Sequence, residues 1–462
     1  MALTVSVSEL VEQSNNPLLK ARAGWPRVRL GDIATVLNGY AFKSDLFTRD
    51  EGVPLIRIRD VGSDASETRY KGEFDARYLV NAGELLIGMD GDFNCARWRG
   101  EPSLLNQRVC KVTVRSKDFN DRFLDYLLPG YLNAINAATS STTVKHLSSR
   151  SIEDMPLPFP PLAEQTEIVE EFEKQFSRLD EAVANLKRVK ANLKRYKAAV
   201  LKAAVEGRLV PTEAELSRKV GDTHETGAQL LQRLVDNRRT KWNGRGKYKE
   251  PEASRAEWQF TIPPSWAWTT LGHLALSVRD GPHFSPKYSD SGIPFISGGN
   301  IRPEGIDFSN TKFISPELHE ELAKRCKPAV GDLLYTKGGT TGIARINTES
   351  REFNVWVHVA VIKVSPEINP FYLQHALNSQ HCYKQSQLHT HGVGNQDLGL
   401  TRMVWITVPL PPRREQDRIV AEIDRRLSIA REIELEVETN LKRAQRLRDA
   451  TLASSFSEHG PL

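Results

Sequence analysis

Cysteine is scarce in this chain, with four residues among 462 (Cys95, Cys110, Cys326 and Cys382). None belongs to a C-x-x-C pair, which argues against a structural zinc site and against a disulfide framework. Long apolar runs are missing as well, because no stretch reaches the roughly 18 residues that a membrane-spanning helix needs. The first residues lack a basic segment and reach Glu9 early, unlike a secretion signal. We therefore expect a soluble, cytoplasmic protein.

The motifs of common nucleotide-using and metal-using enzymes are also missing. The chain has no G-x-x-x-x-G-K-[ST] loop, no H-E-x-x-H, and no G-x-G-x-x-G that opens a helix after a strand. Asn369-Pro-Phe-Tyr372 lacks the second proline of the adenine-methyltransferase motif, and no Pro-Asp dipeptide starts a nuclease motif. His381, His389 and His391 match no zinc spacing, so we interpret them as polar loop or helix residues. We expect no catalytic site, metal or cofactor in this chain.

The clearest positive feature is an internal repeat, which decides the architecture when it is present. Four blocks of the first half recur in the same order in the second half. The pairs are Trp25-Pro-Arg-Val-Arg-Leu-Gly-Asp-Ile-Ala34 with Trp266-Ala-Trp-Thr-Thr-Leu-Gly-His-Leu-Ala275, Gly52-Val-Pro-Leu-Ile56 with Gly292-Ile-Pro-Phe-Ile296, Gly83-Glu-Leu-Leu86 with Gly331-Asp-Leu-Leu334, and Pro160-Pro-Leu-Ala-Glu-Gln165 with Pro411-Pro-Arg-Arg-Glu-Gln416. The shared order indicates two related halves.

Each half combines two kinds of sequence. One kind is rich in glycine, proline and short β-branched runs such as Val109–Val114, which predicts strands bounded by turns, with helical pieces such as 119–138 and 370–387. The other kind follows the double prolines. Residues 164–206 contain no proline or glycine, and their apolar residues recur every three to four positions. That pattern predicts a coiled-coil helix roughly 60 Å long.

The predicted organisation has six parts. They are an N-terminal helical segment (1–22), a mixed α/β globule (23–160), a long helix (161–210), a connector with a short helix (211–262), a second globule (263–410) and a second long helix (411–457). Acidic residues gather at the start of the first long helix and basic residues at its end. This arrangement complements the helix dipole, and a solvated face explains most of it. The basic run 238–247 fits phosphate binding and a soluble linker equally well.

Glycine-rich loops with polar tips recur at matching places in both globules. A backbone without Cβ atoms approaches a ligand closely, and Arg, Asn, Lys and Thr suit groove edges and phosphates. Any one loop is compatible with an ordinary turn, but the repetition favours a shared binding face. The candidate binding residues are Asp90, Asn94, Arg97, Arg99, Thr143, Lys145, Lys337, Thr340, Thr341, Arg345, Asn395 and Gln396.

Taken together, these features resemble the specificity subunit of type I restriction–modification enzymes over nearly the whole chain. The doubled Pro-Pro-x-x-Glu-Gln helix start is the most specific of the shared motifs, and the paired openings at Trp25 and Trp266 support it. The resemblance implies an α+β fold in which two target-recognition globules are separated by two long antiparallel coiled-coil helices, with a pseudo-two-fold repeat. It also implies that the loop residues above bind double-stranded DNA. Each globule would read one half of a bipartite target, and the helices would set the gap.

The resemblance implies partners too. Two modification (methyltransferase) subunits would dock on the helices, and restriction (translocase/endonuclease) subunits would join through them. S-adenosylmethionine, ATP and Mg would then be bound by those partners. The candidate docking residues on the helices are Phe172, Leu179, Leu186, Leu193, Ile423, Leu427, Val437 and Leu441.

The two halves differ at Asn106-Gln107, where the second has Trp356 and Val357. Recognition domains of this family diverge where they read bases. Two other functions stay open, a stand-alone coiled-coil DNA-binding regulator and a monomeric enzyme with an unrecognised active site. Two unlike recognition domains in one chain argue against the regulator.

Overall fold

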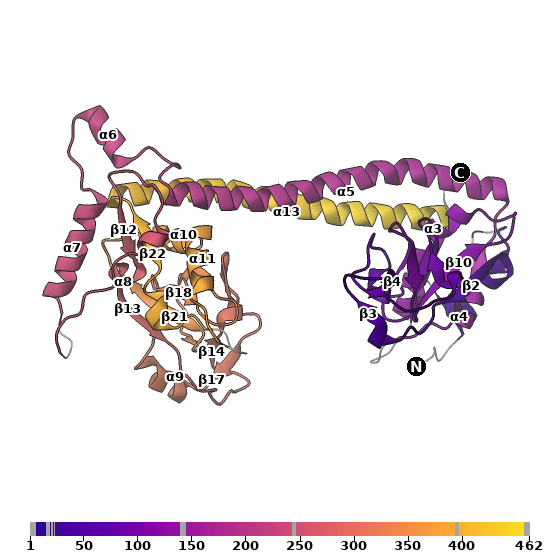
Figure 1. Cartoon of the computed structure of the whole chain (residues 1–462), viewed down its shortest axis with the longest axis horizontal. Coiled ribbons are helices and arrows are strands. Elements are labelled where there is room, and N and C mark those ends of the chain that lie inside the picture. Colours follow the sequence, from indigo (N-terminus) through magenta and orange to yellow (C-terminus); the bar gives the residue numbers. More distant parts are fainter. Residues whose placement is uncertain are drawn as a thin grey trace. The chain divides into compact units, whose positions relative to one another are not determined.

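The structure of the chain is a computed structural model that describes residues 6–14, 19, 22, 24–138, 145–242, 246–392 and 397–456 (Figure 1). It divides into two compact units. Unit 1 comprises Met1–Lys187 with Val437–Leu462, and unit 2 comprises Arg188–Glu436. Each unit contains one β-rich domain and parts of two long helices, α5 (Leu162–Val205) and α13 (Arg413–Phe456). None of the helices within the described ranges has an apolar stretch long enough to cross a membrane.

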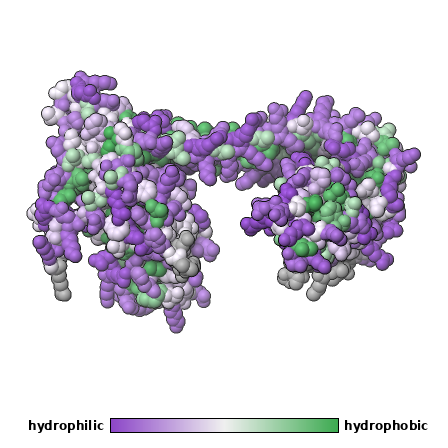
Figure 2. All heavy atoms as spheres, viewed as in Figure 1, coloured by the Kyte–Doolittle hydropathy of each residue, from purple (hydrophilic) through white to green (hydrophobic). Residues whose placement is uncertain are grey.

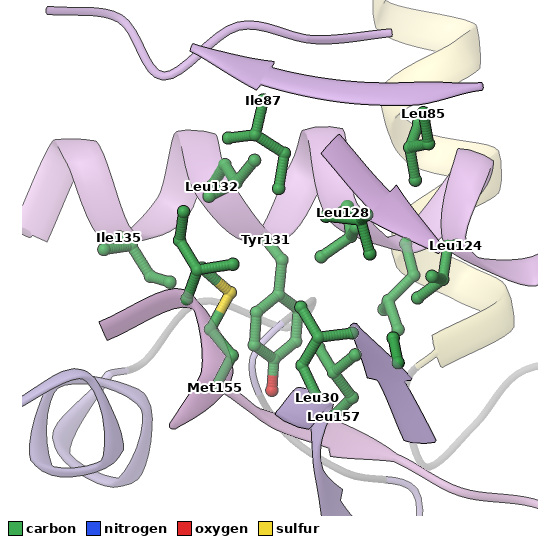
Figure 3. Packing of buried hydrophobic residues seen from close by; sticks show 14 of the residues in the cluster. Leu30, Leu85, Ile87, Leu124, Leu128, Tyr131, Leu132, Ile135, Met155 and Leu157 are labelled. Carbon is green, nitrogen blue, oxygen red and sulfur yellow. The ribbon is translucent and has the colours of Figure 1, made fainter. Parts of the chain in front are cut away.

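The main sheet of the first domain has four antiparallel strands in the order β2-β10-β7-β8. Their bounds are β2 (Ala34–Asn38), β7 (Leu85–Gly88), β8 (Cys95–Arg97) and β10 (Val109–Val114). Alternate residues of a strand point to opposite faces, so Leu85 and Ile87 face helix α3 (Asp121–Ala138). Figure 3 shows Ile87 near Leu132 and Leu85 near Leu124 and Leu128, whereas Tyr131 of the same helix points to the other side, toward Leu30, Met155 and Leu157. This packing forms the largest core of unit 1.

The other elements of unit 1 surround this sheet. Leu86, on the opposite face, packs with Ile56, Trp98 and Leu105, so a second layer covers that side. The second layer is a five-stranded sheet in the order β3-β5-β4-β9-β6. The remaining bounds are α1 (Val7–Gln13), β1 (Arg27–Arg29), α2 (Leu30–Ile33), β3 (Phe47–Thr48), β4 (Val53–Ile56), β5 (Arg69–Tyr70), β6 (Leu79–Val80), β9 (Ser103–Leu105), α4 (Ser149–Glu153) and β11 (Pro156–Pro158).

The second domain repeats the strand order of the first, as β13-β21-β18-β19. These strands are β13 (Ala275–Asp280), β18 (Leu333–Thr336), β19 (Ala344–Ile346) and β21 (Val359–Val364). The predicted α+β class with two related globules is therefore confirmed. The remaining bounds are β12 (Ala267–Thr270), α8 (Leu271–Leu274), β14 (Ile293–Ile296), β15 (Ile301–Arg302), β16 (Gly305–Ile306), β17 (Lys312–Ile314), α9 (Pro316–Ala323), β20 (Asn354–Val355), α10 (Pro370–Leu377), α11 (Gln380–Leu388), α12 (Leu400–Met403) and β22 (Thr407–Leu410).

Two helical predictions differ from the structure in detail. The piece expected at 370–387 is two helices, because α11 begins anew at Ser379, whose side chain accepts from the backbone of Cys382. The connector contains two helices in place of one, α6 (Glu213–Val220) and α7 (Gly227–Thr240). Gly221 ends α6 in the left-handed conformation, and Thr226 forms a capping box with Gln229 that starts α7.

The long helices pack together in antiparallel fashion. In unit 1, Asp180 of α5 forms a 2.8 Å ion pair with Arg448 of α13. In unit 2, Lys197 of α5 forms an ion pair with Glu434 of α13. Residue numbers thus rise along α5 while they fall along its partner. Apolar residues of both helices share one core in each unit, for example Leu179 with Leu452 and Val200 with Ile423.

Candidate nucleic-acid interface

The repeated Pro-Pro-x-x-Glu-Gln motif fixes each domain to the start of its long helix. Gln165 donates to the carbonyl of Pro160 at 2.8 Å and accepts from the backbone N–H of Asn120 at 2.7 Å. Gln416 makes the same pair of bonds with Pro411 and Asn369, at 2.9 Å each. Asn120 and Asn369 immediately precede α3 and α10, so the glutamine ties the helix that supports each main sheet to the long helix.

The glycine-rich loop of each domain lies near the far end of the helices that pack on its main sheet. In the first domain the side-chain amide of Asn136, near the end of α3, donates to the carbonyl of Gly91 at 3.1 Å. Sixteen residues of helix separate Asn136 from Asn120, which is about 24 Å at 1.5 Å per residue. In the second domain Gln387, near the end of α11, donates to the carbonyl of Thr341 at 3.0 Å. The loops thus occupy the end of each domain that is remote from its helix anchor.

Backbone hydrogen bonds identify the residues that occupy equivalent places in the two loops. The N–H of Met89 donates to Arg108, and that of Leu147 donates to Met89; Lys337 donates likewise to His358, and Leu398 to Lys337. A bridge also pairs Asp90 with His146, and another pairs Gly338 with Asp397. Three positions therefore correspond. We call them the strand-end cluster, formed by Asp90, Arg108 and His146 in the first domain and by Gly338, His358 and Asp397 in the second.

In the first domain this cluster is charged and partly exposed to solvent. Nδ1 of His146 lies 2.6 Å from Oδ1 of Asp90, and Oδ2 of Asp90 lies 3.5 Å from Nε of Arg108. The Arg108 side chain is 54% exposed. Asp90 and Lys145, both predicted to bind, lie here. Lys145 donates to the carbonyl of Asn136 in α3.

In the second domain the lysine of the same region is buried. Lys337, only 2% exposed, lies 2.9 Å from Asp397 and 3.4 Å from Asp280. Burial by itself raises the pKa of Asp397, but the hydrogen bond and charge of Lys337 outweigh it, so the pKa lies below its ordinary value. Nδ1 of His358 is 3.6 Å from the same carboxylate and has no hydrogen-bond partner in the described part of the chain. Lys337 is thus an internal counter-ion.

The other predicted binding residues lie in several environments. Asn94, Arg99 and Thr340 are exposed, while Thr341 is buried. Thr143, Asn395 and Gln396 lie outside the described residues. Hydrophilic residues cover most of the visible surface of both β-rich domains (Figure 2), which suits a polar partner.

Arg97 and Arg345 are held by their own domains and are not equivalent. Arg97 forms 2.7 Å ion pairs with Asp121 and Asp125, and these carboxylates raise its pKa against the opposing effect of burial. Arg345 donates to the carbonyl of Pro303, and burial lowers its pKa. The strand register pairs Arg97 with Leu85 but Arg345 with Leu334. Leu85 corresponds to Leu333, and Leu333 and Leu334 are neighbours in one strand, so they lie on opposite faces of the sheet. The two arginines therefore point to opposite faces of their sheets.

The residues predicted for partner docking face the interior of the chain. Phe172, Leu193, Ile423 and Val437 are buried, and Leu179, Leu186, Leu427 and Leu441 are half-buried. Phe172 and Leu179 pack in the core of unit 1, and Ile423 and Leu427 pack in the core of unit 2. The exposed large apolar residues of α5 and α13 are different ones, namely Leu162, Val189, Tyr196, Ile429, Ile433, Leu435 and Leu447.

Sequence reasoning missed Arg108, His146, His358 and Asp397. Arg108 directly follows the Asn106-Gln107 pair, which had already marked a divergent position between the halves. Within the described residues, no group of three or more His, Cys, Asp or Glu side chains is placed to hold a metal ion.

Comparison with known proteins gives a consistent result. Residues 23–195 and 266–442 match the family model described as the type I restriction modification DNA specificity domain. The type I restriction enzyme EcoBI specificity subunit of Escherichia coli is 35% identical over 463 residues, which covers 99% of this chain and 90% of that protein. The EcoKI specificity subunit of Escherichia coli strain K12 is 22% identical, covering 95% of this chain and 89% of the relative.

A solved structure agrees on the fold. A chain from a structure described as showing complex assembly and conformational transition of the type I R-M system aligns over 95% of this chain and 99% of its own length. Its sequence identity is 17% and its TM-score is 0.58.

Proposed function

The chain belongs to the type I restriction–modification DNA specificity family, and we propose that it reads a bipartite double-stranded DNA target through its two β-rich domains. It is the DNA specificity subunit of such a system, and the catalytic activity lies in the other subunits. Each domain contacts one half of the target, and the paired helices α5 and α13 set the number of base pairs between the halves.

One observation carries this proposal. The two domains share strand order and the glutamine anchors to their long helices, yet they differ in chemistry at equivalent exposed ends. The strand-end cluster holds Asp90, Arg108 and His146 in one domain and Gly338, His358 and Asp397 in the other. A shared scaffold with different polar groups at one place suits two readers of different base sequences. A stand-alone regulator that dimerises would present two identical readers.

The DNA-facing surface in this proposal includes the exposed predicted residues Asn94, Arg99 and Thr340, together with Asp90 and Lys145. Thr143, Asn395 and Gln396 stay in the proposed set because they flank the strand-end cluster in sequence. Lys337, Thr341, Arg97 and Arg345 have structural roles within their own domains in this proposal. Their side chains are buried or bonded to their own domains.

Two modification subunits dock on the helices, and restriction subunits join through them. Because the seam residues are buried, we assign docking to the exposed apolar residues, such as Tyr196 and Ile433. S-adenosylmethionine, ATP and Mg bind to these partner subunits. A complex of this kind acts on DNA in the cytoplasm.

A methylation assay tests the function directly. The purified chain is incubated with S-adenosylmethionine and genomic DNA, with and without its modification subunit, and methylated positions are mapped by sequencing. We expect a single bipartite motif in the complete mixture and no methyl transfer by the chain alone. Methyl transfer by the chain alone, or a continuous motif without a gap, would overturn the proposal.

A further inference from the structure

Arg108 is held in an unusual backbone conformation at the exposed end of the main sheet. Its φ is +70°, in the left-handed region that non-glycine residues seldom adopt. It lies in the turn between β9 and β10, where the N–H of Gln107 donates to the carbonyl of Tyr40 at 2.9 Å. Gln107 and Tyr40 are exposed beside it. The turn therefore presents a guanidinium, an amide and an aromatic ring on one edge of the domain.

The proton count at His146 leaves donors of Arg108 unused. The Nδ1 atom of His146 either carries a proton and donates a hydrogen bond or carries a lone pair and accepts one, but it cannot do both. At 2.6 Å from the Asp90 carboxylate this nitrogen carries the proton and donates it. It cannot also accept from Nη1 of Arg108, which lies 3.1 Å away. The only acceptor side chain near Arg108 within the described residues is then Asp90, at 3.5 Å from its Nε.

Asp90 and His146 thus orient the guanidinium without saturating it. The hydrogen bond to His146 fixes one oxygen of Asp90, and the other oxygen faces Nε of Arg108. An arginine oriented in this way offers two parallel donors to a partner. Such a fork matches the O6 and N7 acceptors of guanine in the major groove. Phosphate accepts the same fork, but the arginine is replaced by His358 in the second domain. A group that differs between two readers of different half-sites favours base reading over a contact to the common backbone.

The second domain provides an internal contrast. At the position of Asp90 it has Gly338, and a Cβ placed there would lie 2.0 Å from Nδ1 of His358. The absence of a side chain at Gly338 thus makes room for the imidazole that replaces Arg108. The nearby Lys337 is buried between Asp280 and Asp397, and Arg325 pairs with the other oxygen of Asp280. No exposed guanidinium occupies the equivalent place in the second domain.

We propose that Arg108 reads a guanine in the first half of the DNA target and that Asp90 and His146 are its positioning residues. This inference rests on the proposed function, since it requires that the first domain contacts base edges. Beyond the proposed function, it names the residue that reads the DNA, the base that it reads and the two side chains that orient it.

The test compares the motifs methylated by the complete complex with wild-type chain, Arg108→Lys and Arg108→Ala. Arg108→Lys keeps the charge but loses the fork. We expect both variants to relax one guanine position in one half-site, with discrimination against the other bases falling by about 10- to 100-fold. The other half-site should be unchanged. Arg115→Ala is the matched control, because Arg115 follows the opposite end of β10 and donates to the carbonyls of Gly31 and Ala34. It should leave every motif position unchanged.

The outcomes separate the two claims. Absence of a bipartite motif with the wild-type chain contradicts the proposed function itself. A normal wild-type motif that both Arg108 variants also methylate, unchanged at every position, overturns the assignment of Arg108 alone. A uniform loss of methylation at all sites would indicate a phosphate contact and would overturn base reading. Complete loss of methylation by variants that melt within a few degrees of wild type counts against the inference too.

Discussion

The indole nitrogen of Trp266 donates a 2.8 Å hydrogen bond to Glu415, and at the matching place Trp25 donates to Glu164 at 3.2 Å. The tryptophan opens each β-rich domain, and the glutamate belongs to the Pro-Pro-x-x-Glu-Gln motif that starts each long helix. Together with the neighbouring glutamine, this bond explains why the motif occurs twice. It joins a domain to the helix on which its function depends.

The two tryptophans should differ in how much they stabilise the chain. Glu415 is buried, whereas Glu164 is partly exposed and also pairs with Arg22 at 3.6 Å. Trp266→Phe leaves a buried carboxylate without one donor and should lower the free energy of unfolding by about 1–3 kcal/mol. Trp25→Phe is the matched control, and water should replace much of its bond. Denaturant unfolding of both variants checks this, and equal losses would contradict the role assigned to burial.

Glu415 should also make stability depend on pH. Burial raises its pKa above the ordinary value of 4.5, against the bonds from Glu213 and Trp266. A raised pKa in the folded state means that the protonated form is favoured on folding. The contribution of this group is therefore greatest below about pH 4.5 and declines as the pH rises through the folded-state pKa. We expect the stability of wild type, measured relative to Glu415→Gln, to fall as the pH rises above 4.5. A difference that rises with pH would reverse the sign of this argument.

The architecture was predictable because its evidence is local or repeated in the sequence. The proline-free stretch 164–206 with its three-to-four spacing became α5, and the doubled motifs became matching anchors. The site was less predictable because its partners are far apart in the chain. The glycine-rich loop predicts that Lys337 binds a ligand, but Asp280 and Asp397, which neutralise it, lie on other elements. The equivalence of Arg108 and His358 follows from the Asn106-Gln107 alignment, but their contacts with residues 146 and 397 are visible only in the structure.

Arg97 should contribute mainly to the stability of the folded chain and not to DNA binding. Asp125 is largely buried, and burial raises its pKa while Arg97 opposes that effect. Arg97→Ala removes the main partner of this carboxylate and should cost about 3 kcal/mol. Asp125→Ala combined with Arg97→Ala should cost less than the sum of the single changes. The exposed Arg99→Ala should leave the melting temperature within a degree or two and weaken methylation. Thermal unfolding of the four variants decides between these roles, and a fully stable Arg97→Ala protein would contradict the internal one.

The last prediction concerns the gap in the target. Asp180 pairs with Arg448 and Lys197 pairs with Glu434, so insertions between these pairs keep both of them only if α5 and α13 are lengthened together. Four residues added to α5 within Glu181–Lys197, and four to α13 between Leu435 and Leu447, lengthen each helix by about 6 Å. At 3.4 Å per base pair, 6 Å corresponds to about two base pairs.

Neither reading surface is changed by this double insertion, so both half-sites should keep their bases. We expect methylation at a motif whose gap is longer by one or two base pairs, mapped by sequencing the methylated positions. A double insertion of seven residues preserves the heptad seam better and adds about 10 Å, so it should lengthen the gap by about three base pairs. The insertion in α5 alone is the control. It moves Lys197 out of register with Glu434 and should lower stability. An active double variant that keeps the original gap would mean that the helices do not set the spacing, since their length would then have no effect on where the second half-site is read.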